Sequence, residues 1–217
     1  MVGSQQFVLD IRQAKEIYKY LLKNDYIDTD DLVTQEYRND VAAGTLIPLP
    51  DSLKPLEEGV HKLVQAIFDK VGERILRYYE RVVDMDTVGF ICSNDDWGFN
   101  TQTFLSPEMM RNYLFPWHKK IVETVHKHGK PVLLHSCGNY SEVIEDIIED
   151  MHYDARHSYE DNIIPVEEAY ESLQGRIAVL GGIDINFLVK KSPEEIAERC
   201  RRLLERSWER GGYALGS

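Results

Sequence analysis

The sequence has few cysteines, no long apolar run and no signal-like N-terminus, and each shortage excludes a class of protein. Its three cysteines are an odd number without a regular spacing, so we expect reduced thiols rather than a disulfide framework. No apolar stretch reaches the roughly 18 residues that a membrane-spanning helix needs. The first residues lack the basic and apolar segments of a signal peptide. We therefore expect a cytoplasmic protein without a membrane partner.

Basic residues are also too few for a nucleic-acid-binding protein. The chain has 25 Lys and Arg residues against 37 Asp and Glu residues, which gives a formal net charge of −12. A phosphate backbone is bound by clustered Lys and Arg, and the basic clusters of this chain are surrounded by acids. Hydrophobic residues make up 43% of the chain, enough for a core that folds without disulfides. We expect no nucleic acid among its partners.

The N-terminal part predicts helices and then a loop. Apolar residues recur at helical spacing over residues 5–23, and a weaker helical pattern covers residues 29–43. Gly, Pro, Asp and Ser predominate over residues 44–55, which is typical of a loop and gives the one plausible internal boundary. We therefore divide the chain into a helical N-terminal segment, residues 1–55, and a second part, residues 56–217.

A regular alternation of helices and strands begins at about residue 56. A capping Ser before Pro starts two of the helices, and Pro116 should kink the first of these. Apolar, partly β-branched runs predict the strands, and we expect them to be buried on both faces, Cys92 included. The expected helices cover residues 56–82, 106–129, 140–150, 165–173 and 192–211, and the expected strands cover residues 87–92, 131–135, 153–157, 176–180 and 213–217.

Five strands that each follow a helix imply a parallel sheet. A doubly wound sheet usually carries a Gly-rich phosphate-binding turn, and no such motif occurs. Polar residues follow every expected strand, as they do in a (β/α)8 TIM barrel, whose active site lies at that end. A full barrel has eight strands, so we predict an α/β partial TIM barrel. Its open edge favours a homo-oligomer.

The segment from Pro131 to Asn139 concentrates the chemistry. His135 and Cys137 lie two apart at the end of a strand, so their side chains share a face, whereas Ser136 points away. An imidazole beside a thiolate suits zinc, although two ligands are half a site. The alternative is a buried core histidine beside a small buried cysteine.

Four other residues at strand ends are candidates for the site. Asp95 and Asp96 follow the first expected strand, and only one of these neighbours should point inward. Trp97 could line a pocket for a flat substrate, or it could pack in the core. His157 ends the third expected strand.

Asp184, which follows two glycines at the end of the fourth expected strand, is the last candidate. Those glycines would let the backbone approach a ligand closely, or they serve a turn that needs a positive φ.

Several motifs occur in an order that resembles the uroporphyrinogen decarboxylase superfamily. The likeness covers about residues 56–217 and is greatest to the branch of cobalamin and corrinoid-protein methyltransferases. The motifs are residues 94–98 (Asn-Asp-Asp-Trp-Gly), 105–109 (Leu-Ser-Pro-Glu-Met), 115–117 (Phe-Pro-Trp), 126–130 (His-Lys-His-Gly-Lys), 134–138 (Leu-His-Ser-Cys-Gly), 165–169 (Pro-Val-Glu-Glu-Ala) and 180–184 (Leu-Gly-Gly-Ile-Asp).

The resemblance implies a TIM barrel and a zinc-dependent methyltransferase. In that branch, His-x-Cys and a later Cys hold a zinc ion that activates a thiol or polarises a methyl donor. His135 and Cys137 match the first two ligands, and no Cys before Ser217 matches the third. The resemblance also favours Asp96 over Asp95 as the inward carboxylate.

We accordingly expect zinc on His135 and Cys137, with Asp96 and His157 as catalytic residues and Asp95, Trp97 and Asp184 at the substrate. The partners would be a small-molecule methyl donor or thiol and a corrinoid or cobalamin methyl carrier, on a corrinoid protein in some relatives. Porphyrinogen decarboxylation is the alternative within the superfamily. Outside it, the alternative is a non-catalytic truncated barrel that serves as an interaction subunit.

Overall fold

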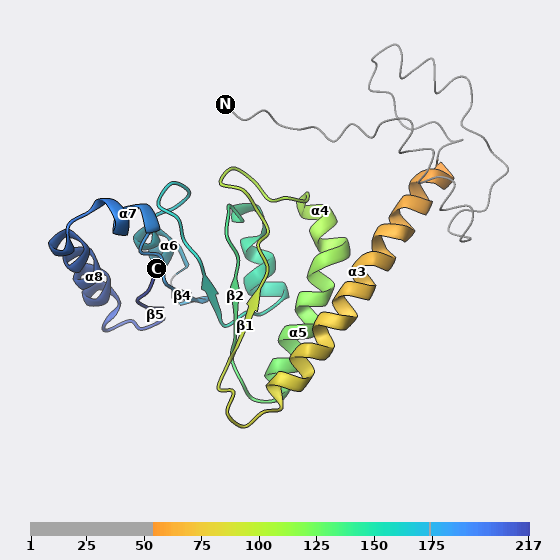
Figure 1. Ribbon diagram of the computed structural model, residues 1–217, viewed down its shortest axis with the longest axis horizontal. Helices are drawn as coiled ribbons and strands as arrows, with labels where there is room; N and C mark the ends of the chain where they lie inside the picture. Colours follow the sequence, from red (N-terminus) through yellow and green to blue (C-terminus); the bar gives the residue numbers. More distant parts are fainter. Residues whose placement is uncertain (1–53, 174) are drawn as a thin grey trace, which may run out of the picture. The chain divides into compact units, whose positions relative to one another are not determined.

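The computed structural model describes residues 54–173 and 175–217 (Figure 1). The helices expected at residues 5–23 and 29–43 lie outside the described residues. The chain divides into two compact units, Met1–Lys70 and Val71–Ser217, and the second contains the five strands found among the described residues. Helix α3 (Lys54–Val83) begins inside the loop expected at residues 44–55, because Pro55 is tolerated in the first turn of a helix.

The five described strands form one parallel sheet in sequential order, β1-β2-β3-β4-β5. Helices connect successive strands, and α5 packs against β2 while α6 packs against β4 (Figure 1). This α/β arrangement is consistent with a TIM barrel in part, as the sequence predicted. The strands are β1 (Ile91–Asn94), β2 (Val132–His135), β3 (Ala155–His157), β4 (Ala178–Leu180) and β5 (Tyr213–Ala214).

The strands are shorter than expected, and β1 is shifted toward its C-terminal end. The sequence placed the first strand at residues 87–92, whereas β1 starts at Ile91, which pairs with Val132. Its partner strand cannot begin earlier because Pro131 has no N–H to donate, and the Pro131 carbonyl instead accepts from the Ile91 amide. From Ile91 the pairing continues to Asn94, which pairs with His135.

The helix expected from Ser106 to residue 129 is present but is not regular. Ser106 caps α4 (Pro107–Met109) by accepting from the Met109 amide, and α5 (Phe115–Lys127) completes the segment. Between them lies the π-helical turn η2 (Met110–Leu114), directly before Pro116. Because proline cannot donate to the preceding turn, the irregularity falls where the kink was expected.

The remaining helices agree with the sequence except at one place. The helix expected at residues 140–150 consists of η3 (Ser141–Val143), a short α-helical link and the π-helical turn η4 (Asp146–Asp150). Helix α6 (Val166–Leu173) is found as predicted, and helix α8 (Pro193–Ser207), which Ser192 and Glu195 cap reciprocally, begins as predicted but ends at Ser207 rather than at residue 211. Helix α7 (Ile185–Lys190) was not predicted, because its short apolar pattern has no clear period.

The two faces of the sheet differ, which corrects the expectation that both are buried. Side chains of one face are buried under the helices: Ile91, Ser93, Val132, Leu134, Arg156 and Val179. On the other face most side chains are exposed or half-buried: Cys92, Asn94, Leu133, His135, His157, Ala178 and Leu180. Cys92 is therefore exposed rather than part of the core. We call the second face the open face.

The loops after β1 and β2 approach each other closely at two glycines. Gly138 has φ +91°, and a Cβ built there would lie 2.2 Å from the carbonyl oxygen of Gly98. The Asn139 amide donates to the Phe99 carbonyl at 2.7 Å, which joins the same two loops. Only glycine permits both the positive φ and this approach.

We predict that Gly138→Ala lowers the free energy of unfolding more than Gly129→Ala does. Gly129 is the matched control, because its φ is also positive, at +67°, yet a Cβ there would meet nothing within 4 Å. The control should lose about 1–2 kcal/mol from backbone strain alone. The clash at Gly138 should add at least about 1 kcal/mol. Equal losses in urea denaturation would contradict the close approach.

Candidate metal centre

Three potential metal ligands meet where the first two strands end. The Asp96 carboxylate, the His135 imidazole and the Cys137 thiol each offer one ligand atom, and the three atoms lie within 4.8 Å of one another. His135 Nε2 lies 3.8 Å from Cys137 Sγ and 3.8 Å from Asp96 Oδ1. Among the described residues this is the one group of three or more His, Cys, Asp or Glu side chains with such spacing.

The strand register explains why these residues meet. Asn94 pairs with His135 across β1 and β2, so Asp96 and Cys137 each follow two residues after this pair. The Cys137 amide donates to Asp96 Oδ1 at 2.9 Å, which holds the carboxylate against the second loop. Ser136 points away from the site, as expected, and its hydroxyl accepts from the Trp97 amide.

His157 fixes the tautomer of His135. The register pairs His135 with His157, and their Nδ1 atoms lie 2.6 Å apart. His157 Nε2 lies 3.0 Å from the Ser217 carbonyl oxygen, which can only accept, so this nitrogen carries the proton. In a neutral His157, Nδ1 is then an acceptor and His135 Nδ1 donates to it. The lone pair of His135 Nε2 consequently faces Cys137 and Asp96.

Burial and neighbouring charges shift the pKa values of both residues in the motif. Burial, together with His157, lowers the pKa of His135, and Asp96 opposes this. The imidazole is therefore neutral near pH 7. Burial also raises the pKa of the Cys137 thiol, the Ser158 hydroxyl lowers it, and the negative charges of Asp96 and Glu160 raise it further. Binding of a cation to the thiolate would release this proton.

The donor set fits a zinc ion in chemistry and in spacing. Bonds of about 2.0–2.3 Å in a tetrahedral site place two donor atoms about 3.3–3.8 Å apart. The two distances from His135 Nε2 are each 3.8 Å, and the third, between Asp96 and Cys137, is at most 4.8 Å, so side-chain movements of about 1 Å or less would bring the three donors to one ion. Asp96 and His135 have side chains that are 55% and 26% exposed, which leaves a path for an ion. One nitrogen, one sulfur and one oxygen donor are a mixture that zinc accepts.

Asp95, expected at the substrate, points the other way from Asp96. Its Oδ2 lies 3.0 Å from Nε2 of the buried His118, whose Nδ1 lies 2.7 Å from the Tyr153 hydroxyl. Because the Asp95 carboxylate can only accept, His118 Nε2 donates to it, and Nδ1 of a neutral His118 then accepts from the Tyr153 hydroxyl. The structure thus brings Asp96, and not Asp95, to His135 and Cys137.

Trp97 and Asp184 have contacts that account for them within the fold. Trp97 is buried, and its ring packs against Phe115 and His118. Asp184 caps α7 by accepting from the amides of Asn186 and Phe187, and it also accepts from the Asp161 amide. Burial raises the pKa of Asp184, but these three bonds outweigh burial and lower it. Neither residue contributes to the group of three ligand atoms.

Sequence reasoning missed two side chains that adjoin the centre. Ser158 Oγ lies 3.9 Å from Cys137 Sγ. Arg156 lies beneath the His-x-Cys segment and donates to the Ser136 carbonyl at 2.9 Å. A charged residue in the middle of a short, otherwise apolar strand was the available signal for Arg156, because such a side chain is almost never fully buried without a reason.

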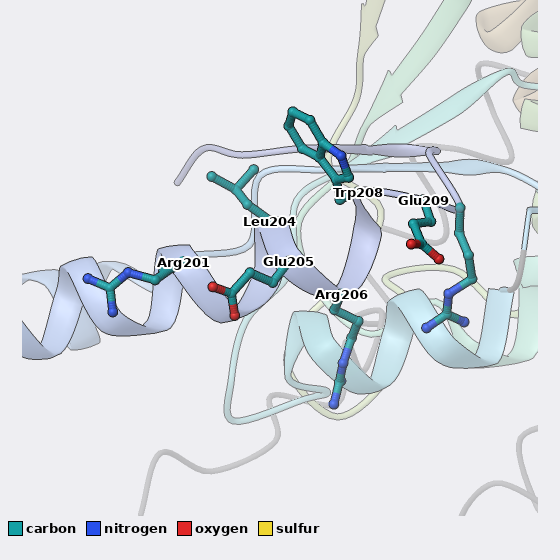
Figure 2. Close-up of a pocket in the computed structure, with 7 residues that line it drawn as sticks. Arg201, Leu204, Glu205, Arg206, Trp208 and Glu209 are labelled. Carbon is teal, nitrogen blue, oxygen red and sulfur yellow. The ribbon is translucent and has the colours of Figure 1, made fainter.

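Hollows elsewhere on the second unit do not include these ligands. One of about 380 Å³ lies at the C-terminal end of α8 and is lined by Arg201, Leu204, Glu205, Arg206, Trp208, Glu209 and Arg210 (Figure 2). Trp208 is 85% exposed there. Arg201 pairs with Glu198, while Arg206 and Arg210 pair with Glu171, so these charges already have partners within the chain.

No described helix is both long and apolar enough to cross a membrane.

A comparison with models of protein families agrees with the motifs. A search of curated proteins found no match. The family model for uroporphyrinogen decarboxylase (URO-D) matches residues 57–217, which include the five described strands and the candidate metal centre. The chain therefore belongs to the uroporphyrinogen decarboxylase family.

Proposed function

We propose that this protein is a zinc-dependent methyltransferase that works with a corrinoid or cobalamin methyl carrier. The observation that supports it best is the group formed by Asp96, His135 and Cys137, in which a neutral imidazole directs its lone pair toward a thiol and a carboxylate. Three protein ligands are the usual number in a catalytic zinc site, whose fourth position is left to water or substrate.

In this proposal Asp96 supplies the third ligand, for which the resemblance offered only a later cysteine. Its Oδ1 accepts from the Cys137 amide, and a carboxylate oxygen retains a further lone pair for a metal ion. Its role as a ligand replaces the catalytic role that we expected from the sequence.

His157 acts as the residue that orients His135. Metal-bound histidines usually donate their second ring N–H to an acceptor, and His157 Nδ1 is that acceptor here. The zinc ion would act as a Lewis acid on a methyl donor or lower the pKa of a bound thiol. The corrinoid would carry the methyl group, and the open face beside the ligands is where a small methylated substrate or thiol would enter.

Among the residues that the structure describes, the charges near the centre favour methyl transfer over porphyrinogen decarboxylation. A substrate with many carboxylates needs cations that are free to bind them. Arg199 is already engaged by Asp161 and Glu167, and Arg156 is fully buried. The groups next to His135 and Cys137 include the acids Asp96 and Glu160 instead.

The homo-oligomer expected from the open edge stays a prediction, which light scattering would test.

We predict that protein purified without chelators carries about one zinc ion per chain, in keeping with one donor group. Cys137→Ala and Asp96→Asn should each weaken zinc binding at least tenfold, because each removes a charged ligand. Competition with a chromophoric chelator measures this. Cys92→Ala is the matched control, because Cys92 is an exposed cysteine of the same sheet face. Equal affinities of Cys137→Ala and the control would refute the site.

We further predict methyl transfer between reduced cobalamin and small methylated substrates, seen as a change in the visible spectrum of cobalamin. Cys137→Ala should slow it at least about 100-fold, because a Lewis acid supplies several kcal/mol of transition-state stabilisation. Cys92→Ala should keep the wild-type rate. Zinc-loaded protein that decarboxylates a porphyrinogen instead would support the alternative reaction. Protein that does neither would leave the role of an interaction subunit.

A further inference from the structure

We infer that Arg156 is a positioning residue for the candidate metal centre: it holds the peptide between His135 and Cys137 so that both side chains reach one ion. This inference rests on the proposed function. Arg156 lies on the buried face of β3, whereas His135 and His157 lie on the open face. It therefore acts from behind the site and touches no ligand atom that a metal ion would use.

The contact is made to the residue between the two ligands. Arg156 Nη2 donates to the Ser136 carbonyl at 2.9 Å, and the Ser136 hydroxyl accepts from the Trp97 amide at 3.2 Å. Ser136 is fully buried. The linking residue is thus held from β3 through its carbonyl and from the loop after β1 through its side chain. Any rotation of the peptide would change the separation of His135 Nε2 and Cys137 Sγ.

Two tyrosines hold the guanidinium in place. Its central carbon lies 3.0 Å from the ring centroid of Tyr140 and 4.5 Å from that of Tyr159. Both rings are buried. Tyr140 belongs to the segment after β2, and Tyr159 belongs to the segment after β3. Arg156 therefore joins the two strand ends that carry Cys137, Ser158 and Glu160.

This burial is hard to explain by stability alone. Arg156 is 0% exposed, and its Nε and Nη1 atoms have no hydrogen-bond partner. Burial lowers its pKa to about 9. A buried charge with unpaired donors is unfavourable, and an apolar side chain of similar volume would often be more stable at such a position. Tyr159 is the first of the groups that favour the charged guanidinium, and Cys137, once its thiol is ionised, and Glu160 follow it. A negatively charged ligand set in front of the guanidinium would therefore favour a cation behind it, in addition to the hydrogen bond to Ser136.

The test compares Arg156→Met with Ile147→Ala in the full-length chain. Methionine keeps much of the volume but has no donor and no charge. Ile147 is a fully buried apolar core residue, so its truncation lowers stability without removing a hydrogen bond to Ser136. The thermal midpoints of both variants show how far each is destabilised. The probes are zinc, by chelator competition, and cobalt(II), whose visible spectrum reports the thiolate ligand and its geometry.

We expect Arg156→Met to bind zinc about 10–100-fold more weakly, as is typical when a group that orients a ligand is lost. The thiolate-to-cobalt absorption should shift or weaken, whereas Ile147→Ala should keep the wild-type spectrum. Equal zinc affinity and an unchanged spectrum in a folded Arg156→Met would overturn the inference. If this variant does not fold, Arg156→Lys decides, because lysine keeps the charge with fewer donors. A wild-type spectrum and affinity in Arg156→Lys would then overturn it.

A measurement without metal separates this inference from the proposed function. In metal-free protein, Arg156→Met should speed hydrogen exchange at the Cys137 amide, because the peptide loses its anchor. Wild-type protein that binds neither zinc nor cobalt would overturn the proposed function. Faster exchange in the variant would then still support the anchoring of this peptide, and unchanged exchange would refute it.

Discussion

The hydrogen bond between the Nδ1 atoms of His135 and His157 determines what this site can do. It exists because β2 and β3 are parallel and in a register that places the two histidines side by side. A shift of one residue in that register would send one ring to the helix-covered face. With the register kept and His157 neutral, the Ser217 carbonyl and His157 together leave His135 Nε2 unprotonated toward Cys137. The chemistry of the site thus depends on backbone pairing.

One face of the sheet packs against the helices and stabilises the fold, and the other face carries the side chains of the candidate metal centre. Leu134 and Val132 are fully buried and hold β2 to the helices, while the alternate residues Leu133 and His135 face the open side. The same alternation sends Arg156 inward and His157 outward on β3. A side chain on the buried face can therefore support a ligand on the open face through one peptide group. Ser136 links the two faces, because Arg156 and the Trp97 amide hold it from the buried side while His135 and Cys137 on either side of it carry the ligand atoms.

The local parts of the site could be predicted from the sequence, and its nonlocal parts could not. Period-two alternation was enough to put His135 and Cys137 on one side and Ser136 on the other. It also showed that only one of Asp95 and Asp96 could point inward. It could not show that Asp96 Oδ1 reaches the Cys137 amide, because that bond depends on how closely two loops approach at Gly98 and Gly138. The exposure of Cys92 also depends on nonlocal structure: parallel strands were expected to be covered on both faces, and the sequence does not show which face stays open.

Electrostatics connects the buried arginine to the exposed acids. Around His135 the structure gathers the potential negative charges of Cys137, Asp96 and Glu160, and like charges this close disfavour one another. Burial, together with these acids, raises the pKa of the Cys137 thiol, so without a cation the thiol stays protonated. A divalent ion in front of the motif would remove that repulsion, and Arg156 behind it supplies one fixed positive charge in advance. The negative charges of the site therefore stay unbalanced until a cation binds. A further anion, such as a substrate carboxylate, would add to the repulsion.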